Sequence, residues 1–91
     1  MTQAKTGEIE LVYFAWVRER LGRDSERLAL PGDVDSVARL IDWLAAIDTD
    51  HADALAARER LVVAVNRERA GPDHPVRAGD EIAVFPPVTG G

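Results

Sequence analysis

The chain has 91 residues, of which 46% are hydrophobic and 30% are charged, a balance typical of a single folded domain. With 11 basic and 16 acidic residues its formal net charge is −5, which disfavours binding to the phosphate backbone of a nucleic acid. Cysteine is absent, which excludes a disulfide, an iron–sulfur cluster, a thiolate zinc site and a cysteine nucleophile within this sequence.

Targeting signals are not recognisable in the sequence. No segment approaches the roughly 20 apolar residues that a membrane-spanning helix needs, and the first residues lack the apolar core of a signal peptide. We therefore expect a cytoplasmic protein that binds neither membrane nor nucleic acid. We interpret residues 1–8 as a flexible N-terminal extension, residues 9–85 as one domain and residues 86–91 as an extended C-terminal tail.

The first third of the chain predicts two strands. Residues 9–16 are apolar on both strand faces and rich in β-branched and aromatic side chains, which predicts a central strand. Residues 17–21 fit a short helical turn that Gly22 stops. Residues 26–30 alternate polar with apolar side chains and end at a Pro-Gly turn, which predicts a second strand antiparallel to the first.

The clearest helix is predicted over residues 33–48, with Asp35 or Ser36 as its N-cap. Its apolar side chains recur at helical spacing, so that one stripe is expected to face a sheet. The stripe consists of Val37, Leu40, Ile41, Leu44 and Ile47. The alanine-rich residues 50–60 are predicted to be helical in part.

The last third of the chain predicts further strands. Residues 61–65 form a short run typical of a buried strand, and residues 67–73 are polar and predict a loop. Residues 74–76 can add a short extended piece, and a turn at residues 78–80 leads into a last strand over residues 81–85.

This order of strand, strand, helix, strand, strand predicts a two-layer α+β domain. One main amphipathic helix is expected on one face of a mixed sheet of four or five strands. The first and last strands are both expected to be central, because each is apolar on both faces.

The two histidines, His51 and His74, are far apart in the sequence, and each lies in a polar segment. Neither has a second histidine at metal-ligand spacing, and nothing nearby would orient it as a base, so we expect exposed loop histidines. No glycine-rich phosphate loop and no clear catalytic triad spacing is present.

A calcium loop is the nearest match to a metal motif, with Asp48, Asp50 and Glu59 at its first, third and last positions. Ala52 and Asp53, however, stand where that loop requires an oxygen ligand and a glycine. We therefore reject calcium, expect no metal, and interpret these acids as the solvated start of a helix.

The chain end offers the remaining candidate chemistry. Gly90 and Gly91 remove every side chain from the last two positions, so this end can enter a channel too narrow for a Cβ. Pro86 and Pro87 bias the tail to an extended form that projects from the domain. The alternative is a frayed terminus that happens to end in glycines.

An exposed carboxylate at Gly91 would be ionised at neutral pH and would be a poor acyl electrophile. Another protein must activate it, most simply as a mixed anhydride with AMP. The tail therefore predicts a partner that uses ATP rather than catalysis by this chain itself.

Three segments resemble a known family. The run Gly-Asp-Glu-Ile-Ala-Val-Phe-Pro-Pro-Val-Thr-Gly-Gly at residues 79–91 is similar to the end of the small subunit of molybdopterin synthase, a ubiquitin-like β-grasp sulfur carrier. Residues 13–19 resemble the first strand of that family and its exit, and residues 63–66 resemble its middle strand. The resemblance covers nearly the whole chain after about seven residues.

The resemblance implies a chemistry for the tail. Gly91 would be the acyl residue that is adenylated and converted to a thiocarboxylate, and Gly90 the slim residue before it. The thiocarboxylate would donate sulfur to a cyclic pyranopterin in molybdenum cofactor biosynthesis. ATP would be used by the activating enzyme, no cofactor would bind this chain, and the catalytic side chains would lie in the large subunit.

The resemblance also implies three partners: the large subunit of the synthase, an ATP-dependent adenylating enzyme and a sulfur donor protein. Phe14 and Phe85 correspond to apolar positions that meet the large subunit, with ordinary core packing as the alternative, and Trp16 departs from the family pattern. The expected partner-binding residues are Phe14, Phe85, Pro86, Pro87, Val88 and Thr89.

The residues also fit three alternative functions. One is a sulfur carrier for thiamine or cysteine synthesis. A second is a ubiquitin-like protein modifier, although ten arginines and the single lysine Lys5 argue against a modifier that forms lysine-linked chains. The third is a β-grasp interaction module in which the glycines have no chemical role.

Overall fold

The computed structural model describes residues 7–87. The elements that it contains, in chain order, are β1 (Glu8–Tyr13), α1 (Ala15–Leu21), β2 (Ser25–Ala29), α2 (Val37–Ala45), α3 (Thr49–Ala54), the 3₁₀ turn η1 (Arg58–Arg60), β3 (Val62–Val65), β4 (Glu68–Ala70) and β5 (Glu81–Phe85).

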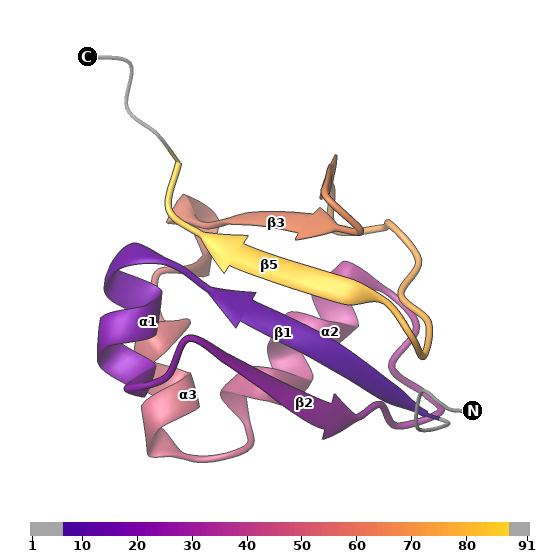
Figure 1. Ribbon diagram of the computed structural model, residues 1–91, viewed down its shortest axis with the longest axis horizontal. Helices are drawn as coiled ribbons and strands as arrows, with labels where there is room; N and C mark the ends of the chain where they lie inside the picture. Colours follow the sequence, from indigo (N-terminus) through magenta and orange to yellow (C-terminus); the bar gives the residue numbers. More distant parts are fainter. Residues whose placement is uncertain (1–6, 88–91) are drawn as a thin grey trace.

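The strands form one mixed sheet in the order β2-β1-β5-β3-β4. The pair β1–β5 is parallel, and the other three pairs are antiparallel. Figure 1 shows the helices on one side of this sheet, with α2 behind its centre. The prediction of an α+β domain with a mixed sheet is confirmed, and the first and last strands are both internal.

The core lies between the sheet and the helices. Alternate residues of β1 and β5 point into it, as the two-residue period of a strand requires, and they meet the buried stripe of α2. Its most buried members from these three elements, all at most 1% exposed, are Ile9, Leu11, Tyr13, Leu40, Leu44, Ile82 and Val84.

The helix α2 is shorter than the predicted residues 33–48. It begins after Ser36, whose hydroxyl oxygen accepts a hydrogen bond from the Arg39 backbone N–H at 3.3 Å. It ends at Ala45 in a tight turn, and the chain restarts at Asp48 as the N-cap of α3. The expectation that Ile47 faces the sheet is therefore wrong, because Ile47 lies beyond the helix end and is 40% exposed.

Two strand predictions need correction. The first strand ends at Tyr13 instead of residue 16, because the helix α1 begins at Ala15. The predicted loop over residues 67–73 contains β4, which pairs with β3. The connecting residues Asn66 and Arg67 both have positive φ, 52° and 72°, as a tight two-residue hairpin requires, but no glycine marks that turn in the sequence.

His51 is buried, with 2% of its surface exposed, so the prediction of an exposed loop histidine is wrong. Its Nδ1 lies 2.7 Å from Asp48 Oδ1 and its Nε2 lies 2.7 Å from Glu26 Oε2. Glu26 also accepts hydrogen bonds from the Tyr13 hydroxyl at 2.6 Å and from Arg23 at 2.7 Å. These five side chains form a histidine clamp that ties α3 to β1 and β2.

A charged imidazole suits the clamp, because each ring nitrogen must donate to a carboxylate. Burial alone would lower the pKa of His51, but the hydrogen bonds and charges of Glu26 and Asp48 outweigh it and raise the pKa above its usual value. Burial likewise opposes ionisation of Glu26, yet the hydrogen bonds from Tyr13, His51 and Arg23 lower its pKa. The clamp is thus an ionic network in the folded state.

The clamp predicts how stability depends on pH. The contribution of a raised His51 pKa is fully present below the unfolded-state value of about 6.5 and is lost as pH rises through the folded-state value. We expect His51→Gln to lower the free energy of unfolding by about 3–5 kcal/mol near pH 6, since one partner of a buried ionic network is removed. Urea titrations at increasing pH should show this deficit shrinking.

His74→Gln is the matched control, because the His74 ring contacts only the Pro75 carbonyl oxygen, at 2.9 Å, among the hydrogen bonds of residues 7–87. It should lower the free energy of unfolding far less than His51→Gln does near pH 6. A constant deficit for His51→Gln across this pH range would contradict a charged clamp.

Candidate functional site at the tail exit

Two aromatic side chains meet where the tail leaves the sheet. In the parallel pair β1–β5, Tyr13 lies beside Val84, so the next residues, Phe14 and Phe85, emerge together at the same edge. Their ring centroids are 6.1 Å apart and the rings are nearly perpendicular, at 87°, which is a favourable edge-to-face arrangement. The backbone N–H of Phe14 also donates to the Val84 carbonyl at 3.3 Å.

A sharp turn after Phe14 fixes its position. Phe14 keeps the extended backbone of β1 and serves as N-cap of α1, whereas Ala15 takes a left-handed φ of 55°. A residue other than glycine adopts this left-handed backbone conformation only at a cost in free energy. The surrounding pairing of β1 and β5 must therefore hold the turn. The chain therefore changes direction directly after Phe14, and this residue is left 46% exposed.

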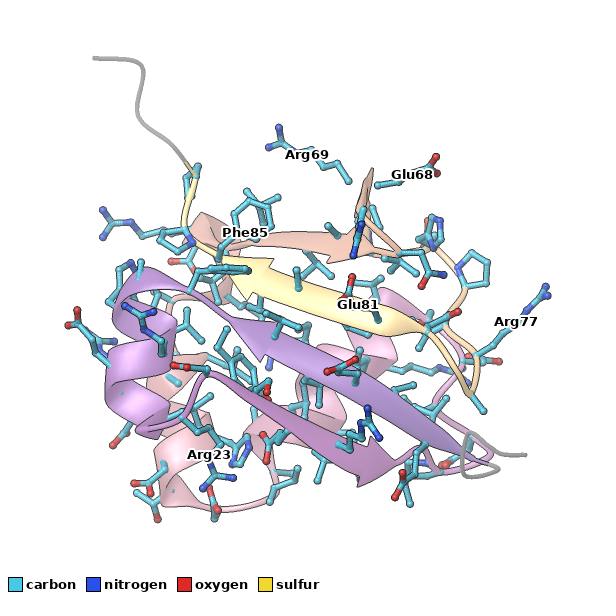
Figure 2. The ribbon with its side chains drawn as sticks, viewed as in Figure 1. Arg23, Glu68, Arg69, Arg77, Glu81 and Phe85 are labelled. Carbon is cyan, nitrogen blue, oxygen red and sulfur yellow. The ribbon has the colours of Figure 1, made fainter. Side chains whose placement is uncertain are left out.

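The aromatic pair lies on the outer face of the sheet, which we define as the face opposite the helices. The neighbours Tyr13 and Val84 are at most 1% exposed in the core, and strand alternation turns Phe85 to the other side. Figure 2 shows Phe85 on this face, close to the point where the chain leaves the sheet. Phe14 and Phe85 therefore both pack outside the core.

Val62 is a member of this site that the sequence alone did not reveal. It lies directly opposite Phe85 in the antiparallel pair β3–β5, and it is half-buried. The apolar run of residues 61–65 is typical of a buried strand, and only the register shows which of its side chains reach the outer face. We define the exit patch as Phe14, Val62, Phe85, Pro86 and Pro87.

The other end of the outer face is charged. Glu10 lies beside Arg27 of β2 and Glu81 of β5, and Arg67 Nε lies 3.5 Å from the Glu81 carboxylate. Across the sheet these four side chains lie in the order Arg27, Glu10, Glu81 and Arg67, so that two neighbouring glutamates are flanked by arginines. These charged side chains limit the extent of the exit patch along the strands. The apolar surface is therefore confined to the end of the sheet from which the tail departs.

The structure places only part of the predicted site. Pro86 is half-buried and Pro87 is exposed, and both border a shallow hollow together with Phe14, Ala15 and Phe85. The predicted partner-binding residues Val88 and Thr89 and the predicted acyl residues Gly90 and Gly91 lie outside the described residues.

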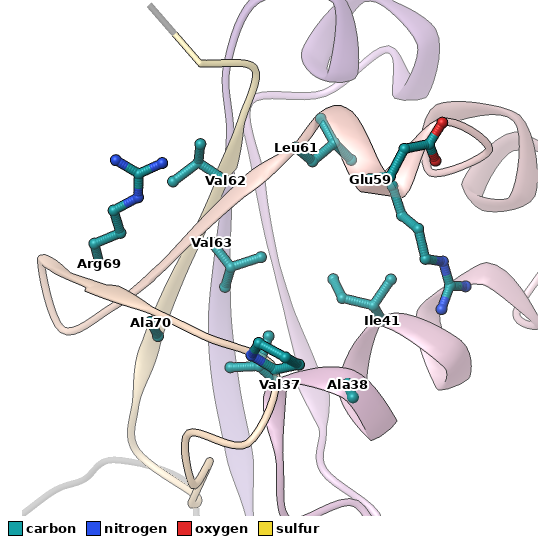
Figure 3. Close-up of a pocket in the computed structure, with 11 residues that line it drawn as sticks. Val37, Ala38, Ile41, Glu59, Leu61, Val62, Val63, Arg69 and Ala70 are labelled. Atoms are coloured by element: carbon teal, nitrogen blue, oxygen red, sulfur yellow. The ribbon is translucent and has the colours of Figure 1, made fainter.

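A second hollow lies on the helix side of the sheet, between α2 and the strands β3 and β4 (Figure 3). Val37, Ile41, Leu61 and Val63 make its walls apolar, and Arg58 at its rim pairs with Asp42. Within residues 7–87 no group of three or more histidine, aspartate and glutamate side chains could hold a metal ion. Nor does any described helix have the length and apolar character to cross a membrane.

Comparison with protein families identifies the chain. Residues 11–91 match the ThiS family. The chain belongs to the ThiS family.

Relatives and solved structures agree with this assignment. The molybdopterin synthase sulfur carrier subunit of Escherichia coli K12 is 42% identical over 83 residues, which cover 91% of this chain and 99% of the relative. The structure of SAMP1 from Haloferax volcanii is 33% identical, with a TM-score of 0.70, and covers 93% of this chain and all of that one. The resemblance to molybdopterin synthase sulfur carriers is confirmed.

The predicted β-grasp fold is confirmed as well. A further structure, the complex of subunits 1 and 2 of the molybdopterin-converting factor from Helicobacter pylori, contains a chain with a TM-score of 0.60. That match covers 92% of this ThiS-family chain and 99% of the other, but at 19% identity it shows the fold alone.

Proposed function

We propose that this chain is the sulfur carrier subunit of a molybdopterin synthase, with Gly91 as its acyl residue. The observation that carries the proposal is the position of the exit patch. A tail that ends in two glycines leaves the sheet beside an exposed apolar surface, so that docking the surface on a partner directs the tail into that partner. The 42% identity to a curated sulfur carrier over nearly its full length supports the choice of pathway.

Activation begins at the Gly91 carboxylate in an ATP-dependent adenylating enzyme. A carboxylate oxygen attacks the α-phosphorus of ATP, pyrophosphate leaves, and an acyl adenylate forms. Hydrosulfide supplied by a sulfur donor protein then attacks the acyl carbon and displaces AMP, which leaves a thiocarboxylate. ATP supplies the free energy because an ionised carboxylate is a poor acyl electrophile.

The large subunit of the synthase receives the thiocarboxylate. The sulfur attacks a carbon of the cyclic pyranopterin and displaces the oxygen substituent of that carbon. Hydrolysis of the resulting thioester leaves the sulfur on the pterin and returns the Gly91 carboxylate. This chain supplies the acyl group and the docking surface, and the catalytic side chains belong to the large subunit. The absence of side chains at the last two residues lets the tail pass through channels that exclude a Cβ.

The exit patch is the anchor for docking. Aromatic side chains in the centre of an interface commonly carry most of the binding free energy. We expect Phe85→Ala to weaken binding to the large subunit of the source organism by more than about 1 kcal/mol, as measured by calorimetry.

Ile47→Ala is the matched control for this substitution, because Ile47 is an exposed apolar residue beyond the end of α2. It should leave binding unchanged. Unfolding is measured for both variants, so that lost binding is counted per folded molecule. Unchanged binding by folded Phe85→Ala would remove Phe85 from the interface.

The tail length is the test of the carrier chemistry. Deleting Gly91 withdraws the carboxylate by up to about 3.3–3.6 Å, and appending one residue turns the Gly91 carboxyl into an amide. Because reacting atoms must approach within about 3–3.5 Å, we expect either change to abolish dithiolene formation in a reconstituted synthase assay. Neither change touches the sheet, so melting curves should match the wild type.

Gly90→Val is a subtler variant, because it keeps the tail length and adds only a branched side chain. It should slow adenylation or sulfur transfer by steric exclusion. Full activity of both the deletion and the extension would mean that the Gly91 carboxylate is not the reactive group.

A protein modifier is the second candidate. A second Haloferax volcanii structure, at 31% identity to this chain, is that of small archaeal modifier protein 1. A modifier would form an isopeptide bond between Gly91 and a lysine of another protein. Such conjugates would resist denaturing electrophoresis, whereas a thiocarboxylate carrier leaves no conjugates. A sulfur carrier for thiamine or cysteine synthesis would form the same thiocarboxylate but would fail in the dithiolene assay.

A further inference from the structure

Three arginines that have no carboxylate partner among residues 7–87 border Pro86 and Pro87 at the base of the tail. Arg20 and Arg60 line one hollow together with Trp16, Pro86 and Pro87, and this hollow lies on the helix side of the tail. Arg69 lines another hollow on the outer face of the sheet, which shares Pro87 and also contains Phe85. The three arginines come from α1, η1 and β4, so only the folded chain brings them to the tail.

Arg27 and Arg77 likewise have no carboxylate partner within the described residues, so it is their position beside Pro86 and Pro87 that sets these three arginines apart. None of the guanidinium groups of Arg20, Arg60 and Arg69 lies within 4.0 Å of a carboxylate among residues 7–87. All three residues are exposed. The chain has 16 acidic and 11 basic residues, yet three guanidinium groups without a carboxylate partner among residues 7–87 lie beside the base of the tail.

Arg20 is held in place by contacts that leave its charge available. Its guanidinium carbon lies 4.8 Å from the centroid of the Trp16 ring, which is a cation–π arrangement. Its NH1 also donates a long hydrogen bond of 3.4 Å to the Asp53 carbonyl oxygen. Neither contact neutralises the positive charge, and both fix the side chain at the hollow.

We propose that Arg20, Arg60 and Arg69 form a basic collar around the tail, and that the collar pairs with carboxylates at the mouth of the channel through which the large subunit admits the tail. The inference rests on the proposed function, because it assigns the collar to the partner that receives Gly91. It adds an electrostatic contact to the apolar one. The exit patch supplies the apolar centre of the interface and the collar supplies part of its charged rim.

A rim of this kind acts mainly on the rate of association. Exposed charges steer two proteins toward the productive orientation, and salt screens this effect over about 10 Å at 0.1 M ionic strength. Because the chain as a whole carries a charge of −5, a basic end gives it a preferred orientation toward an acidic channel mouth. Docking would then start at the end that carries the tail.

The test compares two triple variants with the same net charge. Arg20→Gln/Arg60→Gln/Arg69→Gln removes the collar. Arg27→Gln/Arg39→Gln/Arg77→Gln removes three exposed arginines elsewhere. Figure 2 shows that Arg77, one of the control positions, lies at the opposite end of the sheet from Phe85. Any difference between the variants therefore reports the position of the charges and not their number.

Association rate constants with the large subunit of the source organism are measured by stopped-flow fluorescence at low and high NaCl. We expect the collar variant to associate at least about tenfold more slowly than wild type near 50 mM NaCl. The control variant should stay within about threefold, and the difference should vanish near 500 mM NaCl, where charges are screened. Replacing the collar with three lysines should restore most of the rate.

Each outcome has a distinct meaning. Equal rates for the two triple variants, or a collar defect that persists at high salt, would overturn the collar while leaving the carrier function intact. If the wild-type chain itself failed to bind the large subunit, the proposed function would be wrong and the collar with it. Melting curves of both variants confirm that they are folded.

Discussion

The parallel pairing of β1 with β5 is the interaction on which the site depends. Parallel neighbours end at the same edge of a sheet, so the turn that leads out of β1 and the tail that follows β5 leave the domain together. Phe14 and Phe85 meet there because each directly follows a paired core residue. An antiparallel pairing would have placed the tail at the opposite end from Phe14.

The helical layer supports this edge from behind. The helix α1 follows Phe14 directly and packs on α3, to which Arg20 also reaches. The histidine clamp in turn fixes α3 to β1 and β2 through Glu26 and Asp48. Burying charged groups is costly unless they are paired and hydrogen-bonded, and the clamp meets this condition with five side chains from separate parts of the chain. The helices α1 and α3, together with the histidine clamp, thus support the edge of the sheet that carries the exit patch.

The sequence predicted those features that depend on neighbouring residues. The strand over residues 81–85 and the buried stripe from Val37 to Leu44 follow from local periodicity and are confirmed. Ile47 continues the same spacing, but the pattern could not show that the helix ends at Ala45 to let Asp48 cap the next one. The hairpin between β3 and β4 was missed because its two residues of positive φ are not glycines.

The features that the sequence did not predict depend on long-range contacts. Val62 joins the exit patch only through its register with Phe85, which no local pattern specifies. His51 looked isolated because Glu26 lies 25 residues away along the chain. The chemistry proposed for the tail, by contrast, rests on the resemblance of residues 79–91 to a family of sulfur carriers, and Gly90 and Gly91 lie outside the described residues.

The central claim is that Gly91 carries sulfur as a thiocarboxylate. The most direct measurement is the intact mass of the chain after coexpression with the adenylating enzyme and a sulfur source, followed by fragmentation to locate the change. The account predicts a mass increase equal to the exchange of one oxygen for sulfur, confined to Gly91, and no increase when the adenylating enzyme is omitted. An unchanged mass with an active adenylating enzyme, or a sulfur atom located at any other residue, would contradict it.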